Sequence, residues 1–112
     1  MSILSSKKAG VLIVMPDIRL DTQTAPATDQ LIVEAIAQGE TRILVDFAKT
    51  NYISSAGLRV LLIVTKPLKK AGGQLLIVCA RTGYVYEVLE TSGFTNIIPV
   101  FESVEEAARN AS

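Results

Sequence analysis

The sequence contains no histidine, no tryptophan and a single cysteine, Cys79, among its 112 residues. Without histidine there is no imidazole acid or base near neutral pH, no Ser-His or Cys-His nucleophile pair and no histidine metal ligand. One cysteine cannot form an internal disulfide, which predicts a reduced, cytoplasmic setting. Any catalysis would therefore have to depend on carboxylates or lysines. We expect a protein that is not an enzyme and that uses no cofactor or metal.

Neither sign of charge is in excess, because eleven Lys and Arg balance eleven Asp and Glu. A chain without net charge has no broad positive field for phosphates, so we expect neither nucleic acid nor a membrane as the primary partner. The longest apolar runs, at 75–80, 11–15 and 60–64, are far shorter than the roughly 20 residues of a membrane-spanning helix. The first residues also lack the apolar stretch of a secretory signal.

Aliphatic residues dominate what remains, since hydrophobic residues make up 49% of the chain and aromatic residues only 5%. The core is therefore expected to consist of Val, Ile, Leu and Ala. A chain of this length forms one ordinary domain without room for a second. We expect a single domain over residues 1–112.

Short apolar segments alternate with helical patterns along the chain. Strands are expected at 11–15, 42–47, 74–79 and 97–100, with residues 3–4 as a further edge strand. Helical spacing of apolar residues is found before Gly39, from the 54–57 turn to Gly72, between Thr82 and Gly93, and over 104–110. This alternation predicts an α/β sandwich in one domain, with a mixed sheet of four to five strands and about four helices.

Local signals predict where several of these elements begin and end. Pro67 lies inside the second helical pattern, where its missing N–H predicts a kink or an early end. Thr82 is expected to cap the third helix, and Ser103 with Glu106 predicts a capping box for the last. Pro99 predicts that the last strand lies at an edge of the sheet.

Ser54 and Ser55 lie where a strand leads into the second helix, and their chemistry allows two interpretations. A serine at this place commonly caps the helix, its hydroxyl accepting a hydrogen bond from a backbone N–H, while Gly57 permits close packing. Alternatively, one hydroxyl faces solvent beside the positive end of the helix dipole, where an added phosphate is tolerated.

Three segments, 43–47, 52–62 and 71–75, resemble the STAS domain, specifically the small bacterial anti-sigma factor antagonists. Arg19-Leu20-Asp21 is similar to that family's turn before the first helix, and residues 89–94 resemble its Leu-x-x-x-Gly-Phe segment. The resemblance covers nearly the whole chain and implies a STAS-like fold. Ser54 stands where the family often has Asp, and Ile18 stands where it has Gly.

The resemblance implies a partner switch. Such proteins bind an anti-sigma factor with serine kinase activity, release it when that kinase phosphorylates one serine at this turn, and are reset by a serine phosphatase. By position the phosphoacceptor is Ser55, with Ser54 as second choice. We expect a monomer or a weak homodimer, because an exposed N-terminal edge strand can pair with the same strand of another copy. The resemblance also implies a partner-binding surface made by Asp21, Tyr52, Ile53, Ser54, Ala56, Gly57 and Arg59.

Other interpretations stay open. A STAS module can instead sense a nucleotide or small ligand, or serve as a scaffold in a signalling complex, without phosphorylation. Asp46 ends a strand, as the phosphorylated aspartate of receiver domains does, but the acidic pair and late lysine of a receiver are lacking, so we expect Asp46 to shape its loop. Cys79 is expected to be a small buried thiol.

Surface side chains near the turn allow two interpretations each. Tyr52 and Tyr84 are either exposed anchors for a partner or pack under a loop. Arg59 is either solvated or contacts an acidic surface of the partner. The lysines at 66, 69 and 70 form a local basic patch, most simply a solvated surface.

Overall fold

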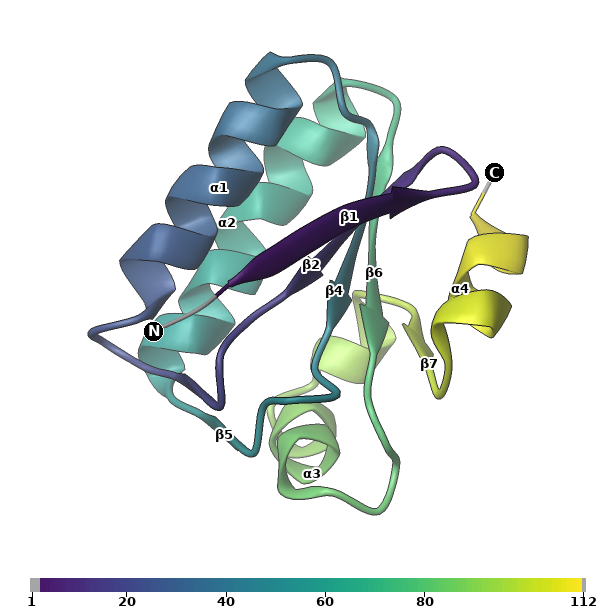
Figure 1. Cartoon of the computed structure of the whole chain (residues 1–112). Coiled ribbons are helices and arrows are strands. Elements are labelled where there is room, and N and C mark those ends of the chain that lie inside the picture. The colour runs from purple at the N-terminus through teal and green to yellow at the C-terminus, as the bar shows by residue number, and fades with distance from the viewer. Residues whose placement is uncertain (1–2, 112) are drawn as a thin grey trace.

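The structure is a computed structural model that describes residues 3–111, and its centre is a mixed sheet (Figure 1). Within these residues five strands run in the order β1-β2-β4-β6-β7, with β1 antiparallel to β2 and every other neighbouring pair parallel. A separate parallel pair joins β3 (Arg19–Leu20) to β5 (Tyr52–Ile53). The strands of the main sheet are β1 (Leu4–Lys8), β2 (Val11–Met15), β4 (Arg42–Asp46), β6 (Gln74–Val78) and β7 (Val100–Phe101).

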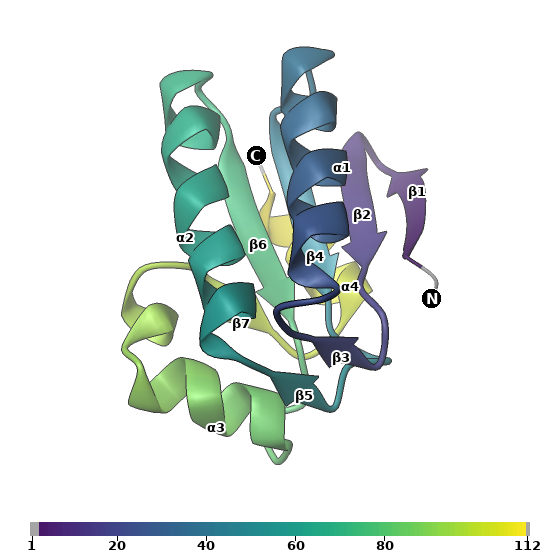
Figure 2. The same ribbon diagram turned by 90° about the vertical axis from the view of Figure 1, so that its left-hand side faces the viewer.

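Helices cover both faces of this sheet (Figures 1 and 2). On one face α1 (Ala25–Ala37) and α2 (Ser55–Lys70) lie side by side, and on the other lies α4 (Val104–Asn110). The fourth helix, α3 (Tyr84–Thr91), and the 3-10 helix η1 (Phe94–Asn96) follow β6. The expected α/β sandwich, with a mixed sheet of four to five strands and about four helices, is confirmed, since residues 3–111 form a five-stranded main sheet and four α-helices.

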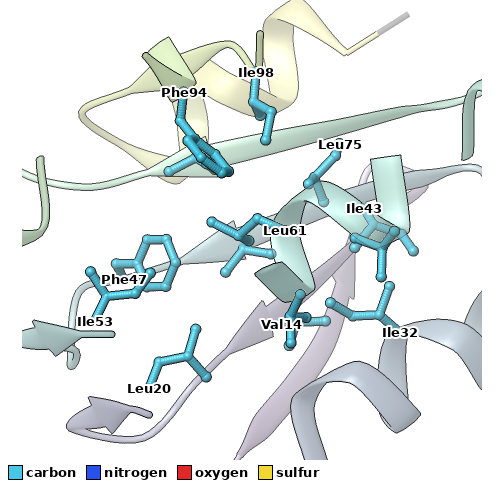
Figure 3. Close-up of a cluster of buried hydrophobic side chains, with 14 of the residues drawn as sticks. Val14, Leu20, Ile32, Ile43, Phe47, Ile53, Leu61, Leu75, Phe94 and Ile98 are labelled. Carbon is cyan, nitrogen blue, oxygen red and sulfur yellow. The ribbon is translucent and has the colours of Figure 1, made fainter. Parts of the chain in front are cut away.

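Apolar side chains lie on both faces of the sheet, because helices cover both faces and bury the central strands from either side. Ile43 of β4 lies on the side of α1 and α2, close to Ile32 and Leu61 (Figure 3), and Val45 belongs to the same cluster. Leu44 points the other way, into a smaller cluster under α4. The larger cluster continues to the two-stranded sheet and η1 through Leu20, Phe47, Ile53 and Phe94.

The predicted capping box is confirmed, but two boundaries are wrong. Glu106 N donates to Ser103 Oγ at 3.1 Å, as a capping box requires. The residue that precedes α3 as its N-cap is Gly83 instead of Thr82, because the first helical bond runs from Glu87 N to the Gly83 carbonyl. The last strand is 100–101, since Ile98 N donates to the Phe94 carbonyl and continues the turn of η1.

Pro67 does not end α2, which continues to Lys70. The proline lies in the last turn of the helix, where its missing N–H removes one backbone hydrogen bond. Other backbone hydrogen bonds terminate the helix after this turn. Gly72 has φ of +77° at this end, and Gly73 N donates to the Leu68 carbonyl at 2.8 Å. Among the helices of residues 3–111, none combines the length and the apolar character of a membrane-spanning segment.

Candidate functional site

The turn that joins β5 to α2 is held at the end of the sheet where β2, β4 and β6 finish (Figure 2). Parallel strands place their carboxyl ends on one edge, which is where α/β proteins commonly carry their sites. The turn is attached to the β3 segment, because Leu20 pairs with Ile53 and the Leu20 carbonyl accepts from Ser54 N at 3.0 Å. The start of α2 is therefore fixed against the segment that leads to α1.

The two serines of the turn face different surroundings. Ser54 is the N-cap residue, and its carbonyl accepts from Leu58 N at 3.0 Å. Its Oγ is buried without a hydrogen-bond partner in residues 3–111, so the interpretation in which a serine hydroxyl caps the helix does not hold for Ser54. Ser55, the first residue of α2, is exposed. Ser54 as a whole is half-buried, but of the two hydroxyls only that of Ser55 belongs to an exposed residue.

Gly57 lets the first turn of α2 pack directly on β3. A Cβ built on this glycine lies 2.8 Å from the Leu20 carbonyl oxygen and 2.8 Å from Ile53 Cγ1, closer than real Cβ contacts. Ile53 itself is only 2% exposed and belongs to the core. These buried residues position the turn from beneath, while Ser55 and Arg59 lie on its surface.

An open groove of about 490 Å³ lies between the first turns of α1 and α2. Ser55 and Arg59 line it from α2, and Asp29 lines it from α1. Arg59 makes no ion pair with any of residues 3–111. Asp29 Oδ1 is buried without a hydrogen-bond partner in the described residues. Ser55 and Arg59 are four residues apart, the spacing at which side chains of a helix meet.

Asp21 shapes the turn before α1. Its Oδ1 accepts from the N–H groups of Gln23 at 3.0 Å and Thr24 at 3.2 Å, and Arg19 Nε donates to its Oδ2 at 3.2 Å. Burial raises the pKa of this carboxyl, but the hydrogen bonds from Arg19 and the backbone outweigh it, and the pKa is lowered. Asp21 is thus ionised at neutral pH, and both of its carboxylate oxygens accept hydrogen bonds from neighbouring residues.

Arg19 and two tyrosines form an aromatic cluster beside the turn. The Arg19 guanidinium lies 4.2 Å from the centre of the Tyr52 ring, and the Tyr52 and Tyr84 rings stack at 6.0 Å with an angle of 7° between their planes. Tyr84 is 49% exposed and Tyr52 is half-buried, so the cluster reaches solvent through Tyr84. The sequence pointed to both tyrosines but not to their contact with Arg19. That contact depends on the pairing of β3 with β5, which brings Arg19 opposite Tyr52 and was not predicted.

Asp46 and Cys79 have the structural roles expected of them. Asp46 is buried at the end of β4, and its Oδ1 accepts from Ala48 N at 3.0 Å, which shapes the following loop. Cys79 is buried after β6. Burial raises the pKa of its thiol to about 11, with Arg81 lowering it and Glu102 raising it to a smaller extent. No group of three or more Cys, Asp or Glu within residues 3–111 is arranged to hold a metal ion.

The raised pKa of Cys79 predicts slow alkylation in the folded protein. With a pKa of about 11, the thiol forms far less thiolate at pH 8 than a free cysteine does. The higher intrinsic nucleophilicity of that thiolate offsets about half of the loss on a logarithmic scale, so iodoacetamide should react at least about tenfold slower than with the urea-unfolded chain. Mass spectrometry of timed samples measures both rates, and equal rates would contradict this assignment of the thiol.

Comparison with known proteins gives matches over nearly the whole chain. The model of the STAS domain family matches residues 2–107. A Bordetella bronchiseptica protein, provisionally named anti-sigma factor antagonist BtrV, is 37% identical over 108 residues, which cover 96% of this chain and 92% of that protein.

Two solved structures show the same fold at lower sequence identity. The crystal structure of an anti-sigma factor antagonist from Mycobacterium paratuberculosis has a TM-score of 0.88 and 22% identity, covering 98% of this chain and 92% of that one. The Bacillus cell fate determinant SpoIIAA, solved in its phosphorylated form, has a TM-score of 0.73 and 20% identity, covering 96% of this chain and 97% of that one.

Proposed function

This chain belongs to the STAS-domain family of anti-sigma factor antagonists, and we propose that it works as a partner switch controlled by phosphorylation of Ser55. Unphosphorylated, it binds an anti-sigma factor with serine kinase activity. That kinase phosphorylates Ser55 and is released, and a serine phosphatase restores the binding form. One observation carries the proposal: at the β5–α2 turn the Ser55 side chain is exposed while the neighbouring Ser54 Oγ is buried.

A phosphate on Ser55 is compatible with the fold. It adds about −1.5 to −2 charge and three acceptor oxygens. Ser55 is the first residue of α2, so the unpaired N–H groups and the dipole of the helix face the phosphate. Arg59 lines the same groove one turn later and makes no ion pair within residues 3–111. The dianion therefore has two sources of stabilisation that require no rearrangement of the backbone.

The same phosphate opposes binding. In a docked complex the exposed Ser55 hydroxyl would be covered by the partner, and a dianion there must lose its water. A partner surface shaped for a neutral hydroxyl does not replace that hydration, so the cost is several kcal/mol. Binding falls while folding is retained, which is the physical basis of the switch.

Exposed groups around the turn supply the docking surface that we propose. Ala56 and Arg59 lie beside Ser55 on α2, and the Tyr52 ring, stacked with Tyr84, offers the aromatic type of group that is enriched at binding hot spots. Ile53, Ser54 and Gly57 support this surface from beneath. Asp21 orders the adjoining loop through its contacts with Arg19 and Thr24.

One feature of the structure favours an alternative to the phosphorylation switch, namely a sensor of a small ligand. The groove between α1 and α2 combines the unpaired Arg59 with a buried Asp29 oxygen that has no partner in the described residues, over an apolar floor. A small molecule with anionic and cationic groups could bind such a groove. A sensor of this kind would work without any phosphate on Ser55.

Phosphate mapping separates the two functions. We expect that incubation with ATP and the purified anti-sigma factor kinases of the source genome adds one phosphate to Ser55, detected by peptide mass spectrometry. Ser54→Ala is the matched control and should be phosphorylated as the unmodified chain is, whereas Ser55→Ala should take up none. No phosphate with any kinase, together with a nucleotide or metabolite retained on the purified protein, would contradict the switch and favour the sensor.

A further inference from the structure

One stripe of α2 carries unpaired positive charge next to exposed apolar side chains. At about 100° per residue, six side chains of this helix lie within an arc of about 120°, and Ser55 falls inside the same arc. We call this stripe the α2 outer face. Its six residues are Arg59, Leu62, Ile63, Lys66, Lys69 and Lys70.

The charge of this face is not balanced locally. Helix α2 contains four basic residues and no acidic one. The ion pairs found in residues 3–111 involve Lys7, Lys8 and Arg19, so none of the four cations of α2 is paired there. These cations therefore keep their full attraction for an opposite charge on another molecule.

Exposed apolar groups lie between the cations. Leu62 is 51% exposed and Ile63 is 52% exposed, although α2 buries its other face against the core. A groove of about 580 Å³ runs from Leu62 past Lys66 to Lys70, and Ile63 also lines the groove that holds Ser55. The face is therefore continuous from the β5–α2 turn to the end of the helix.

We propose that the α2 outer face docks an acidic amphipathic helix of the anti-sigma factor kinase; the identity of this partner rests on the proposed function. Carboxylates spaced along such a helix match the cations, and its apolar side chains cover Leu62 and Ile63. From Ser55 to Lys70 the face is about 22 Å long, the length of about four helical turns. Phosphate at Ser55 stands at one end of this face and competes with the partner's carboxylates for Arg59.

Other occupants fit the face less well. A second copy bound through the same face would bring four cations against four cations, which costs binding energy. An anionic membrane would be drawn by the lysines, but the chain has no net charge and the face offers only Leu62 and Ile63 to enter a bilayer. An acidic protein segment satisfies both the charges and the apolar pair.

Charge reversal tests the inference. The double variant Lys66→Glu, Lys69→Glu should bind the anti-sigma factor kinase at least about tenfold more weakly, mainly through slower association, and the loss should shrink at high salt. The matched control, Lys7→Glu with Lys8→Glu, makes the same charge change on β1, at the edge of the sheet away from β6 and α2 (Figure 2). If both double variants bound the kinase equally well, the inference would be overturned while the proposed function stood.

A peptide titration decides the inference even if no kinase of the source genome binds, an outcome that would count against the proposed function alone. The probe is a synthetic amphipathic helix of the length of α2 with Leu on one face and Glu on the other, added to the isotope-labelled protein. Chemical shift changes should be concentrated on the α2 outer face, and should be lost with a Gln-for-Glu peptide and with Lys66→Glu, Lys69→Glu. Equal shifts with both peptides, tighter binding to phosphatidylserine vesicles, or self-association through α2 would overturn the inference.

Discussion

Replacing Ser55 with aspartate is expected to weaken binding to the anti-sigma factor kinase by about a hundredfold, while the fold is unchanged. A carboxylate at this exposed position must lose its hydration when the partner covers it, and a loss of about 2.7 kcal/mol corresponds to a hundredfold change in Kd. The helix N-terminus stabilises the same charge in the free protein, which widens the difference between the free and bound states.

The controls for this result lie on the same turn. Ser55→Ala should bind within about threefold of the unmodified chain, because it removes a hydroxyl without adding charge. Ser54→Ala removes a buried hydroxyl that has no hydrogen-bond partner in residues 3–111, so it should change neither binding nor the free energy of unfolding by more than about 0.5 kcal/mol. Calorimetric titration measures binding, and circular dichroism with thermal melting measures the fold. Equal affinity of Ser55→Asp and Ser55→Ala would end the proposal of a phosphorylation switch.

Which of two adjacent serines faces solvent could not be predicted from the sequence. Side chains of neighbouring helical residues point about 100° apart, so a helix that begins one residue earlier or later exchanges the buried and the exposed hydroxyl. The choice of Ser55 over Ser54 came from the family resemblance. The attachment of Ser54 N to the Leu20 carbonyl, a contact between segments far apart in the chain, decides the burial.

Strands with continuous apolar sequences were predictable because burial on both faces requires such sequences. The apolar runs 11–15, 43–45 and 75–78 are of this kind, and all three lie in strands of the main sheet. Strands β3 and β5 have two residues each, too few for any periodicity to appear. Their pairing depends on the tertiary fold, and so the contact of Arg19 with Tyr52 was out of reach of sequence reasoning.

Replacing Gly73 with alanine is expected to destabilise the protein more than any other single methyl addition at its glycines. A Cβ at this position would lie 1.8 Å from the Thr41 carbonyl oxygen and 2.6 Å from the Thr41 carbonyl carbon. Both are backbone atoms, so no change of rotamer relieves the overlap, and the Thr41 carbonyl also accepts a hydrogen bond from Gln74 N at 2.8 Å. The start of β6 would have to move away from β4, and we expect the free energy of unfolding to fall by about 3 kcal/mol or more.

The neighbouring glycine isolates the cause of this loss. Gly72 has φ of +77°, and a methyl group added to it would have nothing within 4 Å, so Gly72→Ala tests backbone strain without a clash and should cost only about 1 kcal/mol. In urea denaturation, Gly73→Ala should therefore lose about three times as much stability as Gly72→Ala, and its melting temperature should fall by more than about 10 °C. Because both changes add one methyl group to the same turn, equal losses would mean that the close approach of Gly73 to Thr41 does not hold β6 against β4.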